Sequence, residues 1–327
     1  MGANSPLVSV VTPVHNGKRY LAECVESVLA QTYRDWEYLV VDNHSTDGTR
    51  EIAQQYAGMD SRVRLHACEE FVDVISSHNR TLRLISPLSK YCKVVSADDW
   101  LYPECLTRMV EAAEANPSAG FVGAYQLSGG GNRWEVRWAG LPARCSVISG
   151  REICRATLLG GPYVFGTPTS TLYRSDLVRS REDFYPTPVP YADVSAYFEY
   201  LRDTDFAFLH QVLSYERVHE NTLSTDHKRI NTQAADVLRN FLDYGPVYLT
   251  KQEFDGRLEA LLGDYYRLLA AGILNFREQK FWEHHRKTLA ELGYPFYCRR
   301  LTKAIGAKLL DLALNPKETI EKALRRL

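Results

Sequence analysis

The fold of this chain is decided by the stretch Lys93-Val94-Val95-Ser96-Ala97-Asp98-Asp99-Trp100-Leu101-Tyr102-Pro103. The β-branched pair Val94-Val95 favours a strand. Pro103 begins an amphipathic helix predicted over residues 104–115. The two carboxylates therefore follow the carboxyl end of a predicted strand, the edge of an open α/β sheet where ligands bind. A solvated turn before a helix N-terminus, where carboxylates favour the helix dipole, is the alternative that this stretch leaves open by itself.

The residues before this stretch alternate between strand and helix patterns. Short apolar runs over residues 7–12 and 36–41 predict buried strands, and apolar residues at helical spacing follow each run. A third strand over 63–67 and a helix around 74–84 complete the pattern. Repeated strand–helix units imply a mostly parallel, Rossmann-like sheet with right-handed crossovers and helices on both faces. The predicted fold class is therefore α/β.

The second half of the chain is less regular, and its character changes near residue 227. We predict strands over 121–125, 134–138 and 169–173, a flexible glycine-rich loop over 128–132, and a closing strand pair over 206–209 and 212–215. Beyond residue 227 the pattern is helical, with one apolar stripe formed by Leu258, Leu261, Leu262, Tyr265, Leu268 and Leu269. We therefore predict one domain over residues 1–226 and a C-terminal helical region over residues 227–327.

Composition and cysteine usage exclude several classes of protein. A net charge of −1 over 327 residues provides no field that would favour nucleic acid as a partner. The seven cysteines include no Cys-x-x-Cys pair, which argues for a reducing compartment and against a disulfide framework or a zinc site. No apolar run approaches the roughly 18 residues that span a bilayer. The first six residues lack a secretory pattern, so we expect a cytoplasmic location.

Polar residues follow three of the predicted strands. They are Pro13-Val14-His15-Asn16, Asp42-Asn43-His44-Ser45 and Ser96-Ala97-Asp98-Asp99. In a doubly wound sheet such strand ends converge on one crevice, so we expect these residues to line one pocket.

The order of these motifs resembles the family 2 glycosyltransferases, which have a GT-A fold and transfer a sugar from a nucleotide donor with inversion. The resemblance rests on several spaced motifs and covers about the first 225 residues. Glycine-rich phosphate loops of the dinucleotide-binding and P-loop types are missing. The motifs are Val10 to Asn16, Val25 to Thr32, Val40 to Thr49, Ser96 to Asp99, Asp193, and Tyr215 to Asn221.

The resemblance implies a nucleotide site and a divalent metal ion, Mn²⁺ or Mg²⁺. Asp42 is suited to accept a hydrogen bond from a pyrimidine imide, whereas a helix cap is its alternative role. The metal ligands implied are Asp98 and His219, because a hard cation bridges a carboxylate to a diphosphate. We expect Asp99 to support the loop. The implied nucleotide-binding residues are Pro13, Val14, His15, Asn16, Asp42, Asn79, Ser96, Ala97, Asp98 and Arg217.

The chain departs from the family pattern at two positions. Ser96 stands where the family has an acid, which puts the strength of metal binding in question. The resemblance places the catalytic base at Asp193, but Ala192 precedes it where the family often has Glu. A base is needed because an alcohol is a poor nucleophile at neutral pH. Asp193 as a helix cap is the alternative, and Glu199 is the second candidate for the base.

The predicted function is an inverting, metal-dependent glycosyltransferase. It would move a sugar from a UDP- or dTDP-sugar to a hydroxyl of a glycan or lipid-linked acceptor in cell-surface polysaccharide synthesis. We expect non-processive transfer, because the Gln-x-x-Arg-Trp pattern of processive synthases is absent. A nucleotidyltransferase and a catalytically silent nucleotide-sugar binding or scaffold protein are the alternatives.

A basic amphipathic pattern ends the chain. Its apolar residues are Leu301, Ile305, Leu309 and Leu312, and its basic residues are Arg299, Arg300, Lys303, Lys308, Lys322, Arg325 and Arg326. Such a helix can lie on an anionic bilayer and bring the enzyme to the inner face of the plasma membrane. Packing on the catalytic domain, or on a second copy in a homo-oligomer, is the alternative.

Overall fold

A computed structural model describes residues 5–130, 133–186, 191–219 and 230–314 of the chain. The chain divides into two compact units, residues 1–220 and residues 221–327. The boundary predicted at residues 226 and 227 lies outside the described residues, so it stays a prediction.

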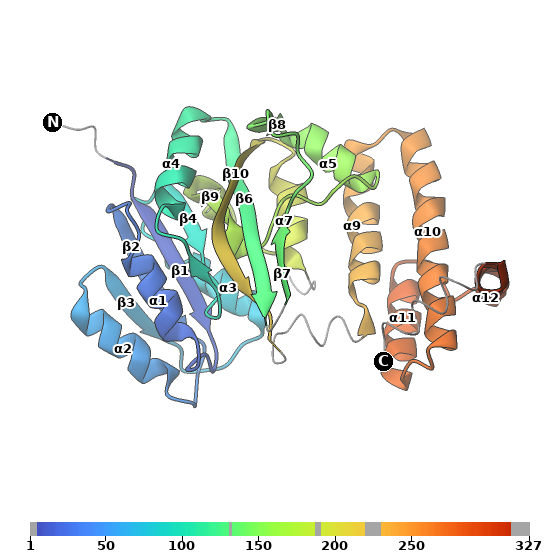
Figure 1. The fold of residues 1–327 in the computed structure, drawn as a ribbon, viewed down its shortest axis with the longest axis horizontal. Helices are drawn as coiled ribbons and strands as arrows, with labels where there is room; N and C mark the ends of the chain where they lie inside the picture. The colour runs from blue at the N-terminus through green and yellow to red at the C-terminus, as the bar shows by residue number, and fades with distance from the viewer. Residues whose placement is uncertain (1–4, 131–132, 187–190, 220–229, 315–327) are drawn as a thin grey trace. The chain divides into compact units, whose positions relative to one another are not determined.

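The first unit is built on one mixed sheet, shown in Figure 1. The strands occur in the order β3-β2-β1-β4-β9-β6-β10-β5, while β7 pairs with β6 and β8 pairs with β10. Their bounds in chain order are β1 Val8–Val14, β2 Trp36–Asp42, β3 Val63–Ala67, β4 Tyr91–Val94, β5 Trp100–Leu101, β6 Ala119–Gly130, β7 Arg133–Arg137, β8 Val147–Ser149, β9 Thr171–Arg174 and β10 Asp205–Arg217.

Strand directions place the carboxyl ends of the main strands at one edge. β1 pairs in parallel with β2 and β4, and β2 pairs in parallel with β3. β9 runs antiparallel to both β4 and β6, so β6 runs in the same direction as β4, and β10 is parallel to β6. The α/β prediction is confirmed, with β9 as an antiparallel strand inside the parallel array. The carboxyl ends of β1, β2, β4, β6 and β10 therefore share one edge.

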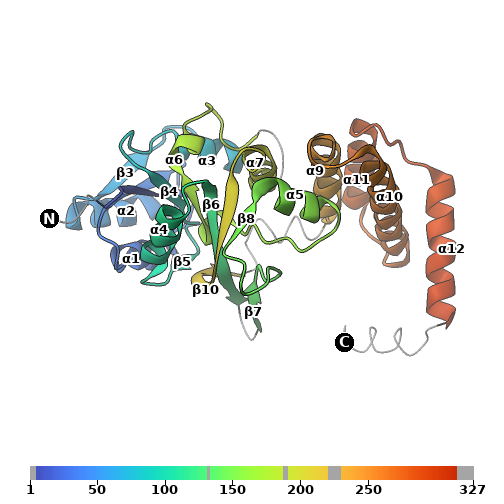
Figure 2. The same cartoon turned by 90° about the horizontal axis from the view of Figure 1, so that it is seen from above.

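Helices cover both faces of the sheet, and Figure 2 shows α1 and α4 on the face opposite α3 and α6. The apolar faces of α1 and α4 contribute to one core with the sheet, in which side chains such as Val10, Val25 and Met109 are fully buried. Burial of each such side chain stabilises the fold by about 1.5–3 kcal/mol. The helices of this unit are α1 Leu21–Leu29, α2 Thr49–Met59, α3 Val74–Leu82, α4 Cys105–Ala115, α5 Gly150–Leu158, α6 Ser175–Val178 and α7 Ala192–Tyr200, with a 3₁₀ turn η1 at Pro168–Ser170.

Two predictions for the second half of the sheet are wrong. The predicted loop over 128–132 begins inside β6, which continues to Gly130 because β7 and β10 pair with it near its end; residues 131 and 132 lie outside the described residues. The predicted strand pair over 206–215 is one strand, β10, and the register against β6 shifts between Leu209 and Val212. Such irregularities insert residues without ending a strand, which makes one strand resemble two in the sequence.

The second unit is helical, as predicted. The helix α10 begins with a capping box in which Thr250 and Glu253 exchange hydrogen bonds. Oη of Tyr265 on α10 lies 2.7 Å from Nδ1 of His285 on α11 in the buried interior. Within the described ranges, no helix combines the length and the apolar character needed to cross a bilayer. The helices are α9 Gln233–Tyr248, α10 Lys251–Leu274, α11 Gln279–Glu291 and α12 Cys298–Leu314.

Candidate functional site

Hydrogen bonds join the loops that follow β1 and β2. Nδ1 of His15 lies 2.9 Å from the carbonyl oxygen of Asn43. The backbone N–H of Asn16 donates to Oγ of Ser45, and Oδ1 of Asn16 accepts from the backbone N–H of Thr46, both over 2.9 Å. Asn16 has a left-handed backbone, with φ of 52°. Strain of this kind persists where the surrounding contacts determine the loop, and it is frequent at functional sites.

The last residues of β1 lie directly beside the end of β2. Pro13 pairs with Val41, and Val14 pairs with Asp42. The Asp42 side chain is fully buried, and its two oxygens accept hydrogen bonds from the Ser45 N–H over 3.0 Å and from Nε of Arg50 over 2.9 Å. Asp42 therefore orients the loop that follows β2. Its contact with a nucleobase stays a prediction.

Asn79 does not lie on a helix surface. Its side chain is buried and forms two hydrogen bonds of 2.8 Å with the backbone of Tyr185, one through Nδ2 and one through Oδ1. The amide thus fixes the segment around Tyr185 to α3. Because this pair uses the amide oxygen and one amide hydrogen, the structure assigns Asn79 a structural role, and a nucleotide contact stays a prediction.

The structure brings Asp98, Arg217 and His219 together at the carboxyl edge of the sheet. Oδ2 of Asp98 lies 3.2 Å from Nε2 of His219. Nε of Arg217 donates to the backbone carbonyl of Asp98 over 3.1 Å, and its terminal nitrogen binds Glu23 at 2.6 Å. The Arg217 guanidinium also lies 4.3 Å from the ring centre of Tyr20. These contacts place a carboxylate, an imidazole and a guanidinium beside one another, as the sequence motifs predict.

Asp99 supports the loop, as expected from the sequence. Its two oxygens accept from the backbone N–H of Arg217 at 3.0 Å and from Oγ1 of Thr169 at 2.6 Å. Burial, together with the charge of Asp98, raises the pKa of the Asp99 carboxyl well above its usual range. Asp99 therefore ties the loop after β4 to the end of β10.

Thr169 and Lys93 are functional candidates that the sequence motifs did not identify. Oγ1 of Thr169 accepts from the Ser96 N–H over 3.1 Å while it donates to Asp99. Nζ of Lys93, fully buried, donates to the carbonyl oxygens of Thr169 at 2.5 Å and of Thr171 at 3.1 Å. Burial lowers the pKa of Lys93 to about 8. The sequence does contain a signal for Lys93, because a lysine inside a predicted buried strand needs partners: burying its charge without them is costly.

The residues at this edge fit a divalent metal ion in part. Two ligands at right angles on an octahedral ion lie about 3 Å apart, which matches the separation of the Asp98 and His219 donor atoms. Imidazole suits Mn²⁺ better than Mg²⁺, which prefers oxygen ligands. Ser96 and Ala97 are partly exposed in the loop between β4 and β5. Over the described ranges, no three His, Cys, Asp or Glu side chains converge on one point.

Asp193 lies in the first turn of α7, after Tyr191, whose backbone is left-handed with φ of 54°. Burial raises the pKa of the Asp193 carboxyl to about 6, against the opposing effect of backbone N–H donors. Its charge also helps to raise the pKa of Tyr163 and of the buried Tyr197, which places the carboxylate near these two phenols. The second candidate base, Glu199, binds Arg181 at 2.6 Å and is held in an ion pair.

Asp193 makes no direct contact with Asp98 or His219 in the described part of the chain. An indirect connection runs through the same helix: Tyr197 donates to Oγ1 of Thr171 over 3.0 Å, and the Thr171 carbonyl accepts from Lys93. Hydrogen bonds therefore connect α7, which carries the predicted base, to β9 and β4.

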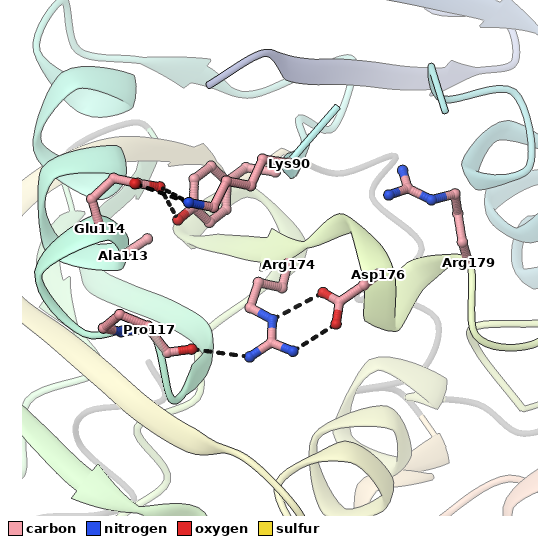
Figure 3. Close-up of a pocket in the computed structure, with 8 residues that line it drawn as sticks. Lys90, Ala113, Glu114, Pro117, Arg174, Asp176 and Arg179 are labelled. Carbon is pink, nitrogen blue, oxygen red and sulfur yellow. Dashed lines mark hydrogen bonds and ion pairs between the residues drawn. The ribbon is translucent and has the colours of Figure 1, made fainter. Parts of the chain in front are cut away.

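A separate cavity of about 420 Å³ lies beside the amino end of β4, shown in Figure 3. Ion pairs join its lining residues, Lys90 with Glu114 at 2.7 Å and Arg174 with Asp176 at 2.6 Å. Because β4 begins at Tyr91 and ends at Val94, this cavity is at the sheet edge opposite the three polar clusters. It is therefore distinct from the candidate site.

Comparisons with known proteins agree with this geometry. The family model described as glycosyl transferase family 2 matches residues 9–180. A putative teichuronic acid biosynthesis glycosyltransferase, TuaG of Bacillus subtilis, is 37% identical over 106 residues, which cover 32% of this chain and 41% of that protein. For the first three curated relatives, the matching segment spans between 18% and 41% of their length.

Two solved structures share the fold. TarS 1–349 of S. aureus in complex with UDP-GlcNAc superposes with a TM-score of 0.65 at 16% identity, covering 98% of this chain and 91% of that chain. The mannosyltransferase PcManGT of Pyrobaculum calidifontis, in complex with GDP-Man and Mn²⁺, has a TM-score of 0.53 at 18% identity, covering 94% of this chain and 86% of that one. At such identities the likeness concerns the fold alone.

Proposed function

Since this chain belongs to glycosyl transferase family 2, we propose that it transfers a sugar, with inversion, from a UDP- or dTDP-sugar to a hydroxyl group. The acceptor is a glycan or a lipid-linked glycan in cell-surface polysaccharide synthesis, and transfer is non-processive. The observation that carries the proposal is the group formed by Asp98, Arg217 and His219 at the carboxyl edge of the sheet. In α/β sheets of this kind, that edge is the ligand-binding edge.

Asp98 and His219 are the residues that would hold a divalent ion. Such an ion, when bound, neutralises charge on the diphosphate leaving group. Arg217 adds a positive charge that is held in place by Glu23 and by the rings of Tyr20 and Trp100. A fixed guanidinium binds phosphate oxygens strongly because its donors are charged and already oriented.

Asp193 is the proposed general base. A pKa raised to about 6 leaves the carboxylate mostly ionised at neutral pH and makes it a stronger base than an ordinary aspartate. It would take the proton of the acceptor hydroxyl as that oxygen attacks the anomeric carbon. The nucleotide departs on the opposite face of the sugar, which accounts for inversion.

The names of similar proteins support the choice of donor, metal and acceptor. TuaG is described as a teichuronic acid biosynthesis enzyme, TarS was solved with UDP-GlcNAc, and PcManGT with GDP-Man and Mn²⁺. We carry a nucleotide-sugar donor, a divalent ion and a polysaccharide acceptor from those proteins to this chain as parts of the proposal.

We also propose a cytoplasmic location with peripheral contact to the membrane through α12. Leu309, Leu310 and Leu314 are 50%, 60% and 70% exposed on this helix, and Arg299 and Lys303 are exposed on it as well. Exposed leucines beside basic residues favour an anionic bilayer surface. Of the predicted apolar face, Leu301 and Ile305 are half-buried and Leu309 is exposed. The Leu312 side chain, Lys322, Arg325 and Arg326 lie outside what the structure describes.

A donor screen tests the proposed function. The full chain is incubated with UDP-, dTDP- and GDP-sugars, with Mn²⁺ or with a chelator, and the released nucleotide diphosphate is measured. We expect slow, Mn²⁺-dependent hydrolysis of one donor without acceptor. Donor binding without turnover would favour a silent binding protein. Release of pyrophosphate from a nucleoside triphosphate and a sugar phosphate would favour a nucleotidyltransferase.

A further inference from the structure

An exposed indole ring lies on the strand β7. Trp134 is 58% exposed. Gly129 of the neighbouring strand β6 lies under its ring, since a Cβ at Gly129 would fall 2.7 Å from Cε3 of Trp134. A second contact of the ring is with Tyr215, at 5.5 Å between centroids and with a tilt of 47° between the ring planes. The indole is therefore supported from below by a residue without a side chain and presents its free surface to solvent.

Hydrogen bonds fix the backbone of Gly129, which lies under the Trp134 ring. The carbonyl of Gly129 accepts from Oη of Tyr215 at 2.7 Å and from the backbone N–H of Val218 at 2.8 Å. Two further apolar side chains, Val136 at 52% and Val218 at 43% exposure, lie nearby. A rigid aromatic surface loses little conformational entropy when a ligand binds to it.

Strand directions place Trp134 at the same sheet edge as the candidate site. Trp134 pairs with Gly129 near the carboxyl end of β6, and Arg217 pairs with Gly129 from β10 on the other side. Ring contacts continue toward Asp98: Tyr215 stacks on Trp100 at 3.7 Å, and Arg217 lies 5.1 Å from the Trp100 ring. The indole and the proposed metal ligands are thus connected by one run of packed side chains.

The order of strands separates Trp134 from the nucleotide side of the site. The nucleotide candidates in the strand-end loops follow β1, β2 and β4, and the remaining two, Asn79 and Arg217, lie on α3 and β10; β6 and β7 lie beyond β9 in the sheet. A ligand held at Trp134 therefore approaches from the side opposite the nucleotide loops, which is where a second substrate must enter. Three exposed apolar side chains are too few for a stable dimer, which buries about 800 Å² per partner.

We infer that Trp134 is a stacking platform for a sugar unit of the acceptor glycan, remote from the reacting hydroxyl. A pyranose presents an apolar C–H face that fits an open aromatic ring, and its hydroxyl rim suits charged neighbours. Arg217 pairs with Gly129 from the other side, so its side chain is on the same face of the sheet as Trp134 and provides such a neighbour. The inference rests on the proposed function and adds a class of ligand, a glycan of several sugar units.

Direct binding tests the platform without turnover. The probes are linear tetrasaccharides of glucose, galactose, mannose and N-acetylglucosamine, and their affinity for the full chain is measured by saturation-transfer NMR titration. We expect at least one tetrasaccharide to bind, with affinity about tenfold weaker in Trp134→Ala and nearly retained in Trp134→Phe. Leu88→Ala, at a side chain 83% exposed elsewhere on the unit, is the matched control and should bind as wild type.

The length of the probe separates a platform from general damage to the site. Monosaccharides should bind equally to wild type and Trp134→Ala, because they do not reach from the site to the indole. Equal loss for monosaccharides and tetrasaccharides, unchanged tetrasaccharide affinity in Trp134→Ala, or binding of none of the tetrasaccharides overturns the inference. Trp134-dependent glycan binding without any donor turnover would support the platform and contradict only the proposed transfer.

Discussion

Oδ2 of Asp98 lies 3.2 Å from Nε2 of His219, although 121 positions separate the two residues in the chain. The pair forms because β10 returns beside β6 and β5, which brings the residues after Tyr215 to the loop that follows β4. Arg217 then closes the arrangement through its bonds to Asp98 and Asp99. A site of this kind depends on the pairing of β10 as much as on the acidic motif.

Thr169 should stabilise the loop after β4 that carries Asp98 and Asp99. Thr169→Val removes the hydroxyl that donates to the buried Asp99 and accepts from the partly buried Ser96 N–H, so two hydrogen bonds are lost. We expect the free energy of unfolding to fall by about 1–3 kcal/mol. Urea denaturation of the full chain checks this, and Thr169→Ser, which keeps the hydroxyl, is the control. Unchanged stability in the valine variant would show that the loop does not depend on this residue.

Asp193→Asn should separate binding from turnover. A neutral amide cannot accept the acceptor's proton, so we expect donor affinity near that of wild type and a large loss of kcat. In wild type, kcat/KM should fall as the pH drops below about 6, where the carboxyl becomes protonated. A pH-rate profile with the identified donor tests both statements. Normal turnover in the variant would show that Asp193 is not the base, and Glu199 would then be the candidate to test.

Asp193→Asn should also raise the stability of the fold at neutral pH. The pKa of Asp193 is about 6 when folded, above the ordinary value of 3.8, so the folded chain binds the proton more tightly. The ionised carboxylate therefore destabilises the fold above pH 6, and this penalty disappears as the pH falls toward 4. We expect Asp193→Asn to be more stable than wild type by about 1–3 kcal/mol at pH 7, and equal to it near pH 4. Thermal unfolding at both pH values measures the difference.

Much of this fold and site could be predicted from the sequence. The alternation of apolar runs and helical spacing identified the sheet, and the motifs predicted that Asp98 and His219 lie together, as they do. Metal binding by this pair stays a prediction. The partners of buried polar groups could not be predicted in the same way. The contacts of Lys93 with Thr169, and of Asn79 with Tyr185, join residues 76 and 106 positions apart, and no local pattern specifies such pairs.

Ser96 should make metal binding weak in the absence of donor. The loop offers one carboxylate beside His219, since Asp99 is engaged with Thr169 and Arg217. We expect Ser96→Asp to bind Mn²⁺ more tightly than wild type by about tenfold, because a second carboxylate joins the site. Titration calorimetry without nucleotide compares the two proteins. Tight binding of Mn²⁺ by the donor-free wild type would contradict this view.

The membrane proposal can be tested on the intact chain. Leu309→Glu with Leu310→Glu removes two exposed apolar side chains from α12 and adds negative charge. We expect flotation with anionic liposomes at low salt for wild type and its loss in the double variant, and weaker flotation of wild type at high salt because charges are screened. Equal partitioning of both proteins would leave α12 with a role in packing or self-association.

The most direct test of the account is donor turnover by Asp98→Asn in the presence of Mn²⁺. Asp98 is about one-third exposed, with a side-chain exposure of 32%, so its replacement should leave the unfolding midpoint unchanged. We predict that wild type hydrolyses or transfers from one nucleotide sugar only with the divalent ion, and that Asp98→Asn loses this activity by about 100-fold or more. Full activity of a folded Asp98→Asn protein with donor and Mn²⁺ would contradict the central claim that this carboxylate holds the metal at the leaving group.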